Sequence, residues 1–432
     1  MTADHDLCDV VELDVTESAD VDATTDRAWL RFQTVFWRNI EAASRGHLTR
    51  TGLRLAARKV LPLSLMAILA ALAVVSSVTA IRSHVLGFDF LGTMWDPSRA
   101  IVRGHSPFPL PTVSAIETGN PAIYPPLLPV LAVPLGALPW GFALAIWTSA
   151  LVVGVAFSVW LAGARDWRCF VVALFSPLIV GGLVFGNIVL LLIVGVSVSW
   201  RWRERPAVSG LALGLTIAAK LVAWPLLVWL LISRRYQAFG YACGALVAGI
   251  LIPWALVGFR GIRDYPTLLR LADRVYGPHG FSLAASAAAL GVSNLGVVFC
   301  LAATATALTA AATFGRKREF DVFAFAVLAT VFVAPIAWPY SFSLLLPCVA
   351  AARPRFSYAW GSFGLLFIVA GLVPHSTVAI EPCCRPTRVP QPIWDFNHLS
   401  PSLWVPLAFA ASATLVVLAS IRVSRSRSEV ST

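Results

Sequence analysis

The segment that decides the fold is PWGFALAIWTSALVVGVAFSVWLAG, residues 139–163, which contains no charged residue. At a rise of about 1.5 Å per residue, this segment forms a helix long enough to cross a hydrocarbon core of about 30 Å. Comparable apolar segments recur along the chain, at 61–81, 237–257, 295–314, 356–374 and 401–421. The sequence therefore predicts an all-α protein that crosses a membrane many times.

Composition leads to the same conclusion. Hydrophobic residues make up 58% of the 432 positions, charged residues 13%, and the mean hydropathy is +0.77. Soluble domains contain about 25% charged residues, so this chain has too few polar groups to cover a water-facing surface, and a soluble enzyme is excluded. The net charge of +11 comes from short basic clusters between apolar segments. The positive-inside rule explains these clusters, and nucleic-acid binding is not expected.

The two ends of the chain are predicted to be cytoplasmic. Residues 1–26 hold nine of the 22 acidic residues and little apolar mass, which is typical of a disordered acidic tail. A basic juxtamembrane segment, 27–59, follows. The membrane domain is predicted over 60–421, and 422–432 form a second tail.

Basic clusters assign the cytoplasmic side of the membrane domain. They lie at 45–59, 201–205, 234–235, 316–318, 353–355 and in the C-terminal tail. Spans that connect them with the right parity number about 12, in a transmembrane bundle with outer loops at 82–123, 258–294 and 375–400.

Four stretches decide the parity. Residues 124–138 are predicted to form one span, and 169–200 either one long broken span or two. The apolar stretch 207–233 has basic residues at both ends, so it is predicted to form two short helices joined near Lys220. The same logic predicts two helices joined at Trp338-Pro339-Tyr340.

Candidate functional residues gather in the predicted outer loops. Asp89 directly follows the first span, where partial desolvation can turn a carboxylate into a useful general base. The alternative is a helix cap or an ion-pair partner for Arg99 or Arg103. Asp96 is the second candidate base, at the start of a short surface helix predicted over 94–103.

Three further features in or beside apolar stretches have open interpretations. Lys220 is the single charge in its stretch, and it either extends to the membrane interface or binds an anion such as a lipid phosphate. Gly186-Asn187 either offers a buried hydrogen bond or is a packing notch. Residues 262–275 are predicted to form a helix with a basic face, lying on lipid headgroups or simply solvated.

Several motifs resemble, in order and spacing, those of glycosyltransferase family 87 in the GT-C superfamily. They are Asp89-Phe90 followed by Gly104-His105-Ser106-Pro107-Phe108, Tyr124-Pro125-Pro126-Leu127, Phe185-Gly186-Asn187, the stretch from Gly210 through Lys220 and Pro225 to Arg235, Phe281-Ser282-Leu283, and Pro335-Ile336-Ala337-Trp338. The resemblance covers about residues 87–345. It departs from the family pattern at two places. Asn187 stands where the family usually has glutamine, and Pro339-Tyr340 lacks the histidine that often follows the tryptophan.

The resemblance implies a function at the extracytoplasmic face of the plasma membrane. The expected donor is a polyprenyl-phosphate-linked sugar, with mannose the first candidate and arabinofuranose the second, and the acceptor is a hydroxyl of a glycolipid or envelope polysaccharide. Asp89 is the expected base, and no metal or cofactor is expected. The other residues assigned by the resemblance are Lys220 and Arg103 for the donor phosphate, and Tyr124, Asn187, Trp338 and Tyr340 for substrate.

The alternative from another class is a secondary transporter or lipid flippase. It would place ionisable residues at mid-membrane and show a repeated half. The sequence has no acid in the middle of a predicted span and no convincing repeat.

Overall fold

A computed structural model describes residues 50–82, 85–117, 122–314, 318–371, 380–383, 391–394 and 403–430. The chain divides into two units, Met1–Leu63 and Ser64–Thr432, and everything described below lies in the second, except the start of α2. The predicted acidic tail, most of the basic segment 27–59 and most of the outer loop 375–400 lie outside the described residues.

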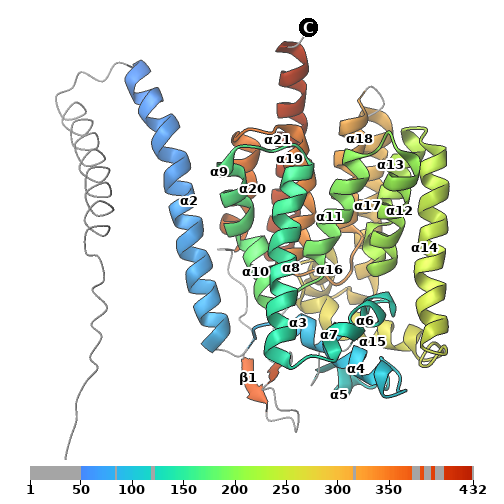
Figure 1. The fold of residues 1–432 in the computed structure, drawn as a ribbon. Coiled ribbons are helices and arrows are strands. Elements are labelled where there is room, and N and C mark those ends of the chain that lie inside the picture. Colours follow the sequence, from blue (N-terminus) through green and yellow to red (C-terminus); the bar gives the residue numbers. More distant parts are fainter. Residues whose placement is uncertain are drawn as a thin grey trace, which may run out of the picture. The chain divides into compact units, whose positions relative to one another are not determined.

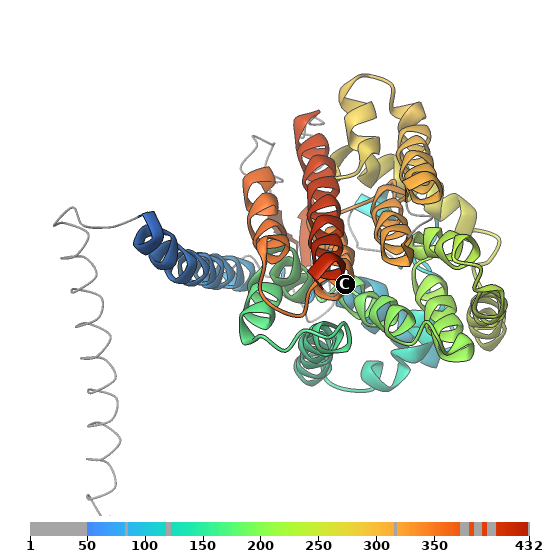
Figure 2. The ribbon, with the colours of Figure 1, turned by 90° about the horizontal axis from the view of Figure 1, so that it is seen from above.

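The Ser64–Thr432 unit is a bundle of helices, and most of its longer helices run roughly along one axis (Figure 1), as the end-on view shows (Figure 2). The elements are α2 (Arg50–Arg82), α3 (Phe88–Phe90), η1 (Leu91–Trp95), α4 (Asp96–Val102), α5 (Val113–Glu117), α6 (Leu127–Leu131), α7 (Val133–Gly136), α8 (Trp140–Leu161), α9 (Trp167–Phe175), α10 (Pro177–Phe185), α11 (Val189–Arg201), α12 (Pro206–Ala219), η2 (Leu221–Ala223), α13 (Pro225–Ile232), α14 (Tyr236–Leu256), α15 (Tyr265–Tyr276), η3 (Gly277–His279), α16 (Leu283–Ala289), η4 (Ser293–Leu295), α17 (Gly296–Phe314), α18 (Glu319–Phe332), η5 (Pro339–Leu345), α19 (Leu346–Ala352), α20 (Tyr358–Gly371) and α21 (Trp404–Val430). Two short antiparallel strands, β1 (Ile380–Cys383) and β2 (Gln391–Trp394), pair with each other.

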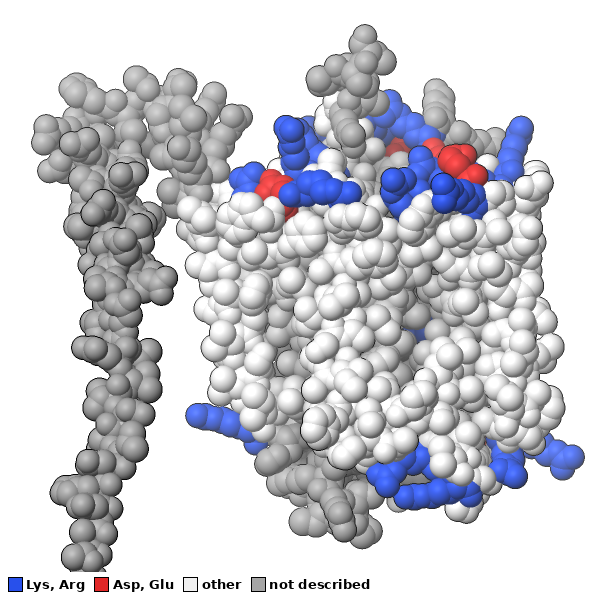
Figure 3. Space-filling view, viewed as in Figure 1, with Lys and Arg blue, Asp and Glu red and all other residues white. Residues whose placement is uncertain are grey.

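The helical membrane fold is confirmed, whereas the count of about 12 spans stays a prediction. Among the described residues, five helices are long and apolar enough to cross a membrane, and the pair α9–α10, bent by 56°, would be a sixth. Several apolar helices of 10–17 residues complete the bundle. Space-filling Figure 3 shows charged side chains in two rims, separated by a broad band that is almost entirely uncharged.

The predicted span at 124–138 is wrong. The structure has two short helices there, α6 of five residues and α7 of four. Pro129 and Pro134 lie within this stretch, and proline removes a backbone donor and clashes with the preceding turn. The short helices pack instead against α4 and η1.

The stretch 169–200 forms two helical segments, the bent pair α9–α10 and the separate helix α11. This agrees with the second of the two predicted alternatives, in which the stretch is divided. Ser176 ends α9 with extended backbone, and its side chain caps α10. Gly186 ends α10 in the left-handed conformation, with φ of 68°, and α11 then begins at Val189. The parity of spans expected for this half of the chain stays a prediction.

The break at Lys220 is confirmed. Lys220 has extended backbone between α12 and η2, and Arg235, after α13, makes ion pairs with both Glu204, before α12, and Glu319. The two ends of this stretch therefore meet at one rim, as two short helices require. The break before η5 at Trp338 likewise agrees with prediction.

Small residues set the close contact between α12 and α14. A Cβ placed on Gly210 or Gly214 would overlap the backbone carbonyl oxygens of Ala238 or Ala242. On the other side of the contact, a Cβ on Gly249 would lie 2.7 Å from the Cβ of Ala218. Close backbone approach of this kind is how small residues favour helix association in membranes, and it fixes the helix that ends at Lys220.

Candidate active site

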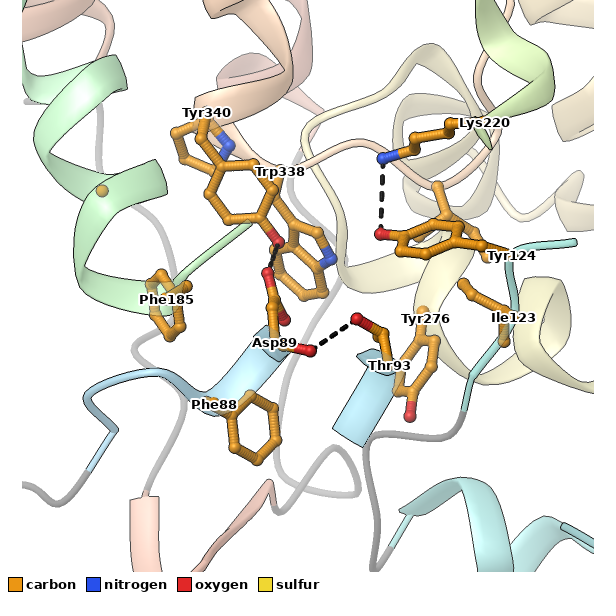
Figure 4. A pocket seen from close by; sticks show the side chains of 13 residues that line it. Phe88, Asp89, Thr93, Ile123, Tyr124, Phe185, Lys220, Tyr276, Trp338 and Tyr340 are labelled. Atoms are coloured by element: carbon orange, nitrogen blue, oxygen red, sulfur yellow. Dashed lines mark hydrogen bonds between the residues drawn. The ribbon is translucent and has the colours of Figure 1, made fainter. Parts of the chain in front are cut away.

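One cavity of about 140 Å³ brings together segments far apart in the sequence. It is mostly apolar and aromatic, with a few polar groups that converge from different elements (Figure 4). Its lining residues are Phe88, Asp89, Thr93, Ile123, Tyr124, Gly181, Phe185, Lys220, Tyr276, Ile336, Trp338, Pro339 and Tyr340. A small enclosed space of this composition is what ligand sites usually look like.

Asp89 lies on α3, a single buried turn that is fixed at both sides. Gly87, with φ of 73°, begins the turn, and its N–H donates to the Val184 carbonyl of α10 at 2.7 Å. Phe90 stacks on Trp140 and Trp147 of α8, with centroids 5.7 and 5.1 Å away. The backbone of Asp89 is therefore placed by two helices, α8 and α10.

The Asp89 carboxylate is buried, with 8% of the residue exposed. Its Oδ2 accepts from Nδ2 of Asn187 at 2.6 Å and from the Tyr340 hydroxyl at 2.8 Å. The Thr93 hydroxyl donates to the Asp89 backbone carbonyl at 2.6 Å, within the π-helical turn η1. Widened turns of this kind are often found at functional sites.

Asn187 is held as firmly as the carboxylate that it contacts. It is 1% exposed, and its Oδ1 accepts from the Val189 backbone N–H at 2.9 Å, at the start of α11. The preceding Gly186 carbonyl accepts from the Trp147 indole at 2.7 Å. Of the two interpretations open for the Gly-Asn break, a buried hydrogen bond or a packing notch, the structure contains the buried hydrogen bond.

Lys220 enters the cavity from the break after α12. Its ammonium donates to the Tyr124 hydroxyl at 3.5 Å and lies 5.0 Å from the centroid of that ring. No carboxylate of the described residues forms a salt bridge with Lys220. A cation held by a phenol ring, with its charge not neutralised by a contacting acid, is suited to bind an anion.

The structure brings most of the predicted site residues together and places two of them outside the cavity lining. Trp338 and Tyr340 line the cavity with Asp89, Tyr124 and Lys220. Asp96 and Arg103 do not line it. Asp96 begins α4, and Arg103 ends it with an exposed side chain.

Sequence reasoning missed Thr93, Phe185 and Tyr276. Tyr276 lies at the inner end of α15, the predicted surface helix, with Leu268 and Ala272 on the same buried face. Its hydroxyl donates to the Ile116 carbonyl at 2.6 Å. The helical spacing of these buried residues was a signal that could have identified Tyr276, on the face opposite the basic one.

The chemical capacity of the site follows from its two charged groups. A fixed carboxylate can accept a proton from a hydroxyl, and an ammonium in the same cavity can stabilise negative charge that develops on a leaving group. Among the described residues, no group of three or more His, Cys, Asp and Glu side chains could hold a metal ion. That metal is not required stays a prediction.

Comparison with known proteins identifies the family. The sequence model of glycosyltransferase family 87 matches residues 122–339, half of the chain, including five of the charged or aromatic residues in the cavity wall. The chain belongs to glycosyltransferase family 87. It is therefore a membrane glycosyltransferase, and the transporter or flippase alternative is set aside.

A curated relative of this family 87 chain comes from Mycolicibacterium smegmatis (strain ATCC 700084 / mc(2)155). It is a polyprenol-phosphate-mannose-dependent alpha-(1-2)-phosphatidylinositol pentamannoside mannosyltransferase. The two are 25% identical over 336 residues, which cover 71% of this chain and 77% of the relative. No solved structure matches the chain.

Proposed function

We propose that this family 87 member transfers a sugar from a polyprenyl-phosphate donor to a hydroxyl of a glycolipid or envelope polysaccharide, at the outer face of the plasma membrane. Mannose is the first candidate for the sugar and arabinofuranose the second. One observation carries the proposal, namely that Asp89 and Lys220 line the same largely apolar cavity within a helical membrane bundle. The relative's use of polyprenol-phosphate-mannose supports this donor class.

In the proposed reaction, Asp89 is the general base. As the acceptor oxygen forms a bond to the anomeric carbon, its proton passes to the Asp89 carboxylate. The bond between that carbon and the donor phosphate oxygen breaks, and the electron pair leaves with the polyprenyl phosphate. A single displacement with one base inverts the anomeric configuration.

Lys220 is the proposed partner of the donor phosphate. Its ammonium lies in the cavity wall beside Tyr124, so a phosphate placed there would receive a charge-assisted hydrogen bond. The attraction is stronger than in water because the surroundings are of low polarity. Trp338 and Tyr124 offer aromatic surface beside the two charges, which suits the apolar face of a sugar.

The experiment is a transfer assay with the full chain in membranes or nanodiscs. Donors carrying labelled mannose or arabinose on a polyprenyl phosphate are supplied, and label in glycolipid and polysaccharide fractions is measured. Transfer that depends on Asp89 supports the proposal. Absence of transfer from both donors, in preparations of folded protein, contradicts it.

A further inference from the structure

A groove of about 750 Å³ lies between three helices of the bundle. Residues of α17 and α21 form its two walls, and α18, which packs against both helices, supplies the floor. None of the residues that line this groove lines the cavity that contains Asp89 and Lys220. The groove is therefore a second hollow of the fold, separate from the candidate active site.

One face of α21 supplies most of the groove lining. Leu418, Ile421, Arg422 and Arg425 all line the groove and follow one another at spacings of three and four residues. Residues three or four apart lie on the same face of a helix. Because this face is apolar at Leu418 and Ile421 and basic from Arg422 onward, the groove has an apolar part and a basic end.

The other two helices make the apolar part suitable for a hydrocarbon chain. Ala310 of α17 is small, so this wall projects little into the groove. Phe325 of α18 is half-buried and offers the side of its ring to the groove. A lipid acyl chain placed there would contact apolar side chains on three sides, and its hydrocarbon would replace no polar contact.

The basic end is held in place by an ion pair between α18 and α21. Asp321, in the first turn of α18, has a side chain that is 2% exposed, and its Oδ2 accepts from Nη2 of Arg425 at 2.6 Å and from Nε at 3.2 Å. Arg422, one turn earlier on α21, has an exposed side chain. Two arginines and one aspartate leave this end of the groove with one positive charge in excess.

We propose that the groove binds an anionic glycerophospholipid, with the phosphate at Arg422 and an acyl chain along Leu418, Phe325 and Ala310. A phosphodiester carries one negative charge, which balances the excess positive charge. A guanidinium offers several N–H donors in a planar fork that fits phosphate oxygens. Basic pockets between transmembrane helices bind anionic headgroups in this way. The bound lipid joins α21 to α17 and α18.

The position of the groove favours a phospholipid over the polyprenyl donor of the proposed function. Its basic end lies at the rim where Arg235 pairs with Glu319, because Glu319 is in the same first turn of α18 as Asp321. The turn α3, which carries Asp89, lies toward the opposite end of the bundle (Figure 1). A donor phosphate at Arg422 would be remote from the cavity, so the proposal does not depend on the proposed function.

The test uses the full chain in nanodiscs of phosphatidylcholine, with and without phosphatidylglycerol. Native mass spectrometry measures the lipid that stays bound after release into detergent, and thermal unfolding is followed in both kinds of nanodisc. Wild type should retain phosphatidylglycerol in preference to phosphatidylcholine, and phosphatidylglycerol should raise its Tm. Arg422→Gln should weaken binding of phosphatidylglycerol about 10-fold, because charge-assisted hydrogen bonds are lost, and the rise in Tm should disappear.

Arg201→Gln is the matched control. It removes the same charge from an exposed side chain at the end of α11, which does not line the groove, so lipid retention should match wild type. Ala310→Phe changes no charge but fills the groove, and it should abolish retention of phosphatidylglycerol. Ala305→Phe, at an exposed position of α17 outside the groove lining, should leave retention unchanged.

Four results would overturn the proposal. The first is equal retention of the two phospholipids by wild type, and the second is equal retention of phosphatidylglycerol by Arg422→Gln and Arg201→Gln. The third is displacement of phosphatidylglycerol by an equimolar amount of polyprenyl phosphate, which would assign the groove to the lipid of the donor. The fourth is a wild-type dimer that Ala310→Phe abolishes, which would assign the groove to a second copy of the chain.

Discussion

Charged groups are held in different ways at the charged rim and in the cavity. At the rim, Arg235 contacts two carboxylates directly, that of Glu204, at 2.7 Å, and that of Glu319. In the cavity, Asp89 accepts from an amide and a phenol, and Lys220 lies against a phenol ring.

The difference separates structural charges from functional ones. An ion pair whose members already satisfy each other has little to offer a ligand, and its role is to join segments of chain. A charged group whose hydrogen-bond partners are neutral is not neutralised by them, so its electrostatic field acts on a ligand that enters the cavity. The charges in the cavity are thus the ones expected to affect transfer, and those at the rim are expected to affect stability.

The largest expected effect is that of Asp89→Asn. Asparagine keeps the shape of the side chain but removes the base, so transfer should fall by a factor on the order of 100 or more, with insertion and donor binding retained. The rate is measured with labelled donor, and the amount of inserted protein is measured in the same membranes.

Asp166→Asn is the matched change at the rim. Asp166 caps α9 and pairs with Arg168 at 2.7 Å, far from the cavity lining. Its transfer rate should equal that of wild type. Asp96→Asn should also be milder than Asp89→Asn, and a dead Asp96→Asn beside an active Asp89→Asn would mean that the base is the other carboxylate.

Lys220→Met should have the next largest effect, about a 10-fold rise in the apparent KM for donor with a smaller change in kcat. Charge pairing with the phosphate helps ground state and transition state alike. The apparent KM is measured by varying the donor concentration at saturating acceptor. Unchanged kinetics would return Lys220 to the interpretation in which the side chain only reaches for the membrane interface.

A smaller effect is expected at the rim from Glu319→Gln. The substitution leaves Arg235, whose side chain is 18% exposed, with the solvent-exposed Glu204 as its acidic partner, at a cost of about 1 kcal/mol of stability. Thermal unfolding in detergent should report a lower Tm, with transfer per folded molecule unchanged. A kinetic defect without a loss of stability would remove the distinction between rim and cavity.

The smallest expected effect is a change with pH in the stability that Asp166 contributes. Hydrogen bonds from the Arg168 guanidinium hold the pKa of Asp166 at about 2, below its ordinary value of 3.8. A depressed pKa contributes stability above the ordinary value, and that contribution is lost as the pH falls through about 2. The difference in Tm between wild type and Asp166→Asn should therefore narrow steadily below about pH 4, and a constant difference would contradict the assignment.

Much of the fold could be predicted from residue pattern. Apolar length indicated a membrane bundle, and basic residues at both ends of 207–233 located the break at Lys220. The span at 124–138 was wrong because hydropathy counts apolar mass and ignores the missing donors of Pro129 and Pro134. The positions of these segments in space depend on packing between parts of the chain that are distant in the sequence. No local sequence pattern records that packing.

The candidate site could also be predicted only in part, because the contacts between its residues depend on packing between distant segments. Asp89, Lys220 and Trp338 stand out from their apolar surroundings, and the family resemblance joined them. Asn187 and Tyr340 were identified, but the expected role was substrate binding, whereas their side chains contact Asp89. Which side chains contact one another depends on three-dimensional proximity. The sequence could therefore mark Asn187 and Tyr340 as site residues without showing that both contact Asp89.

The glycine contact between α12 and α14 has a consequence for how variation in this protein is interpreted. Lys220 is the residue after α12, so its ammonium is positioned by Gly210 and Gly214, which do not line the cavity. A methyl group added at either glycine would push the helix away from α14 and displace the end that carries the lysine. Natural substitutions at these remote positions would then look, in enzymology, like altered donor affinity, although the residues themselves are chemically inert.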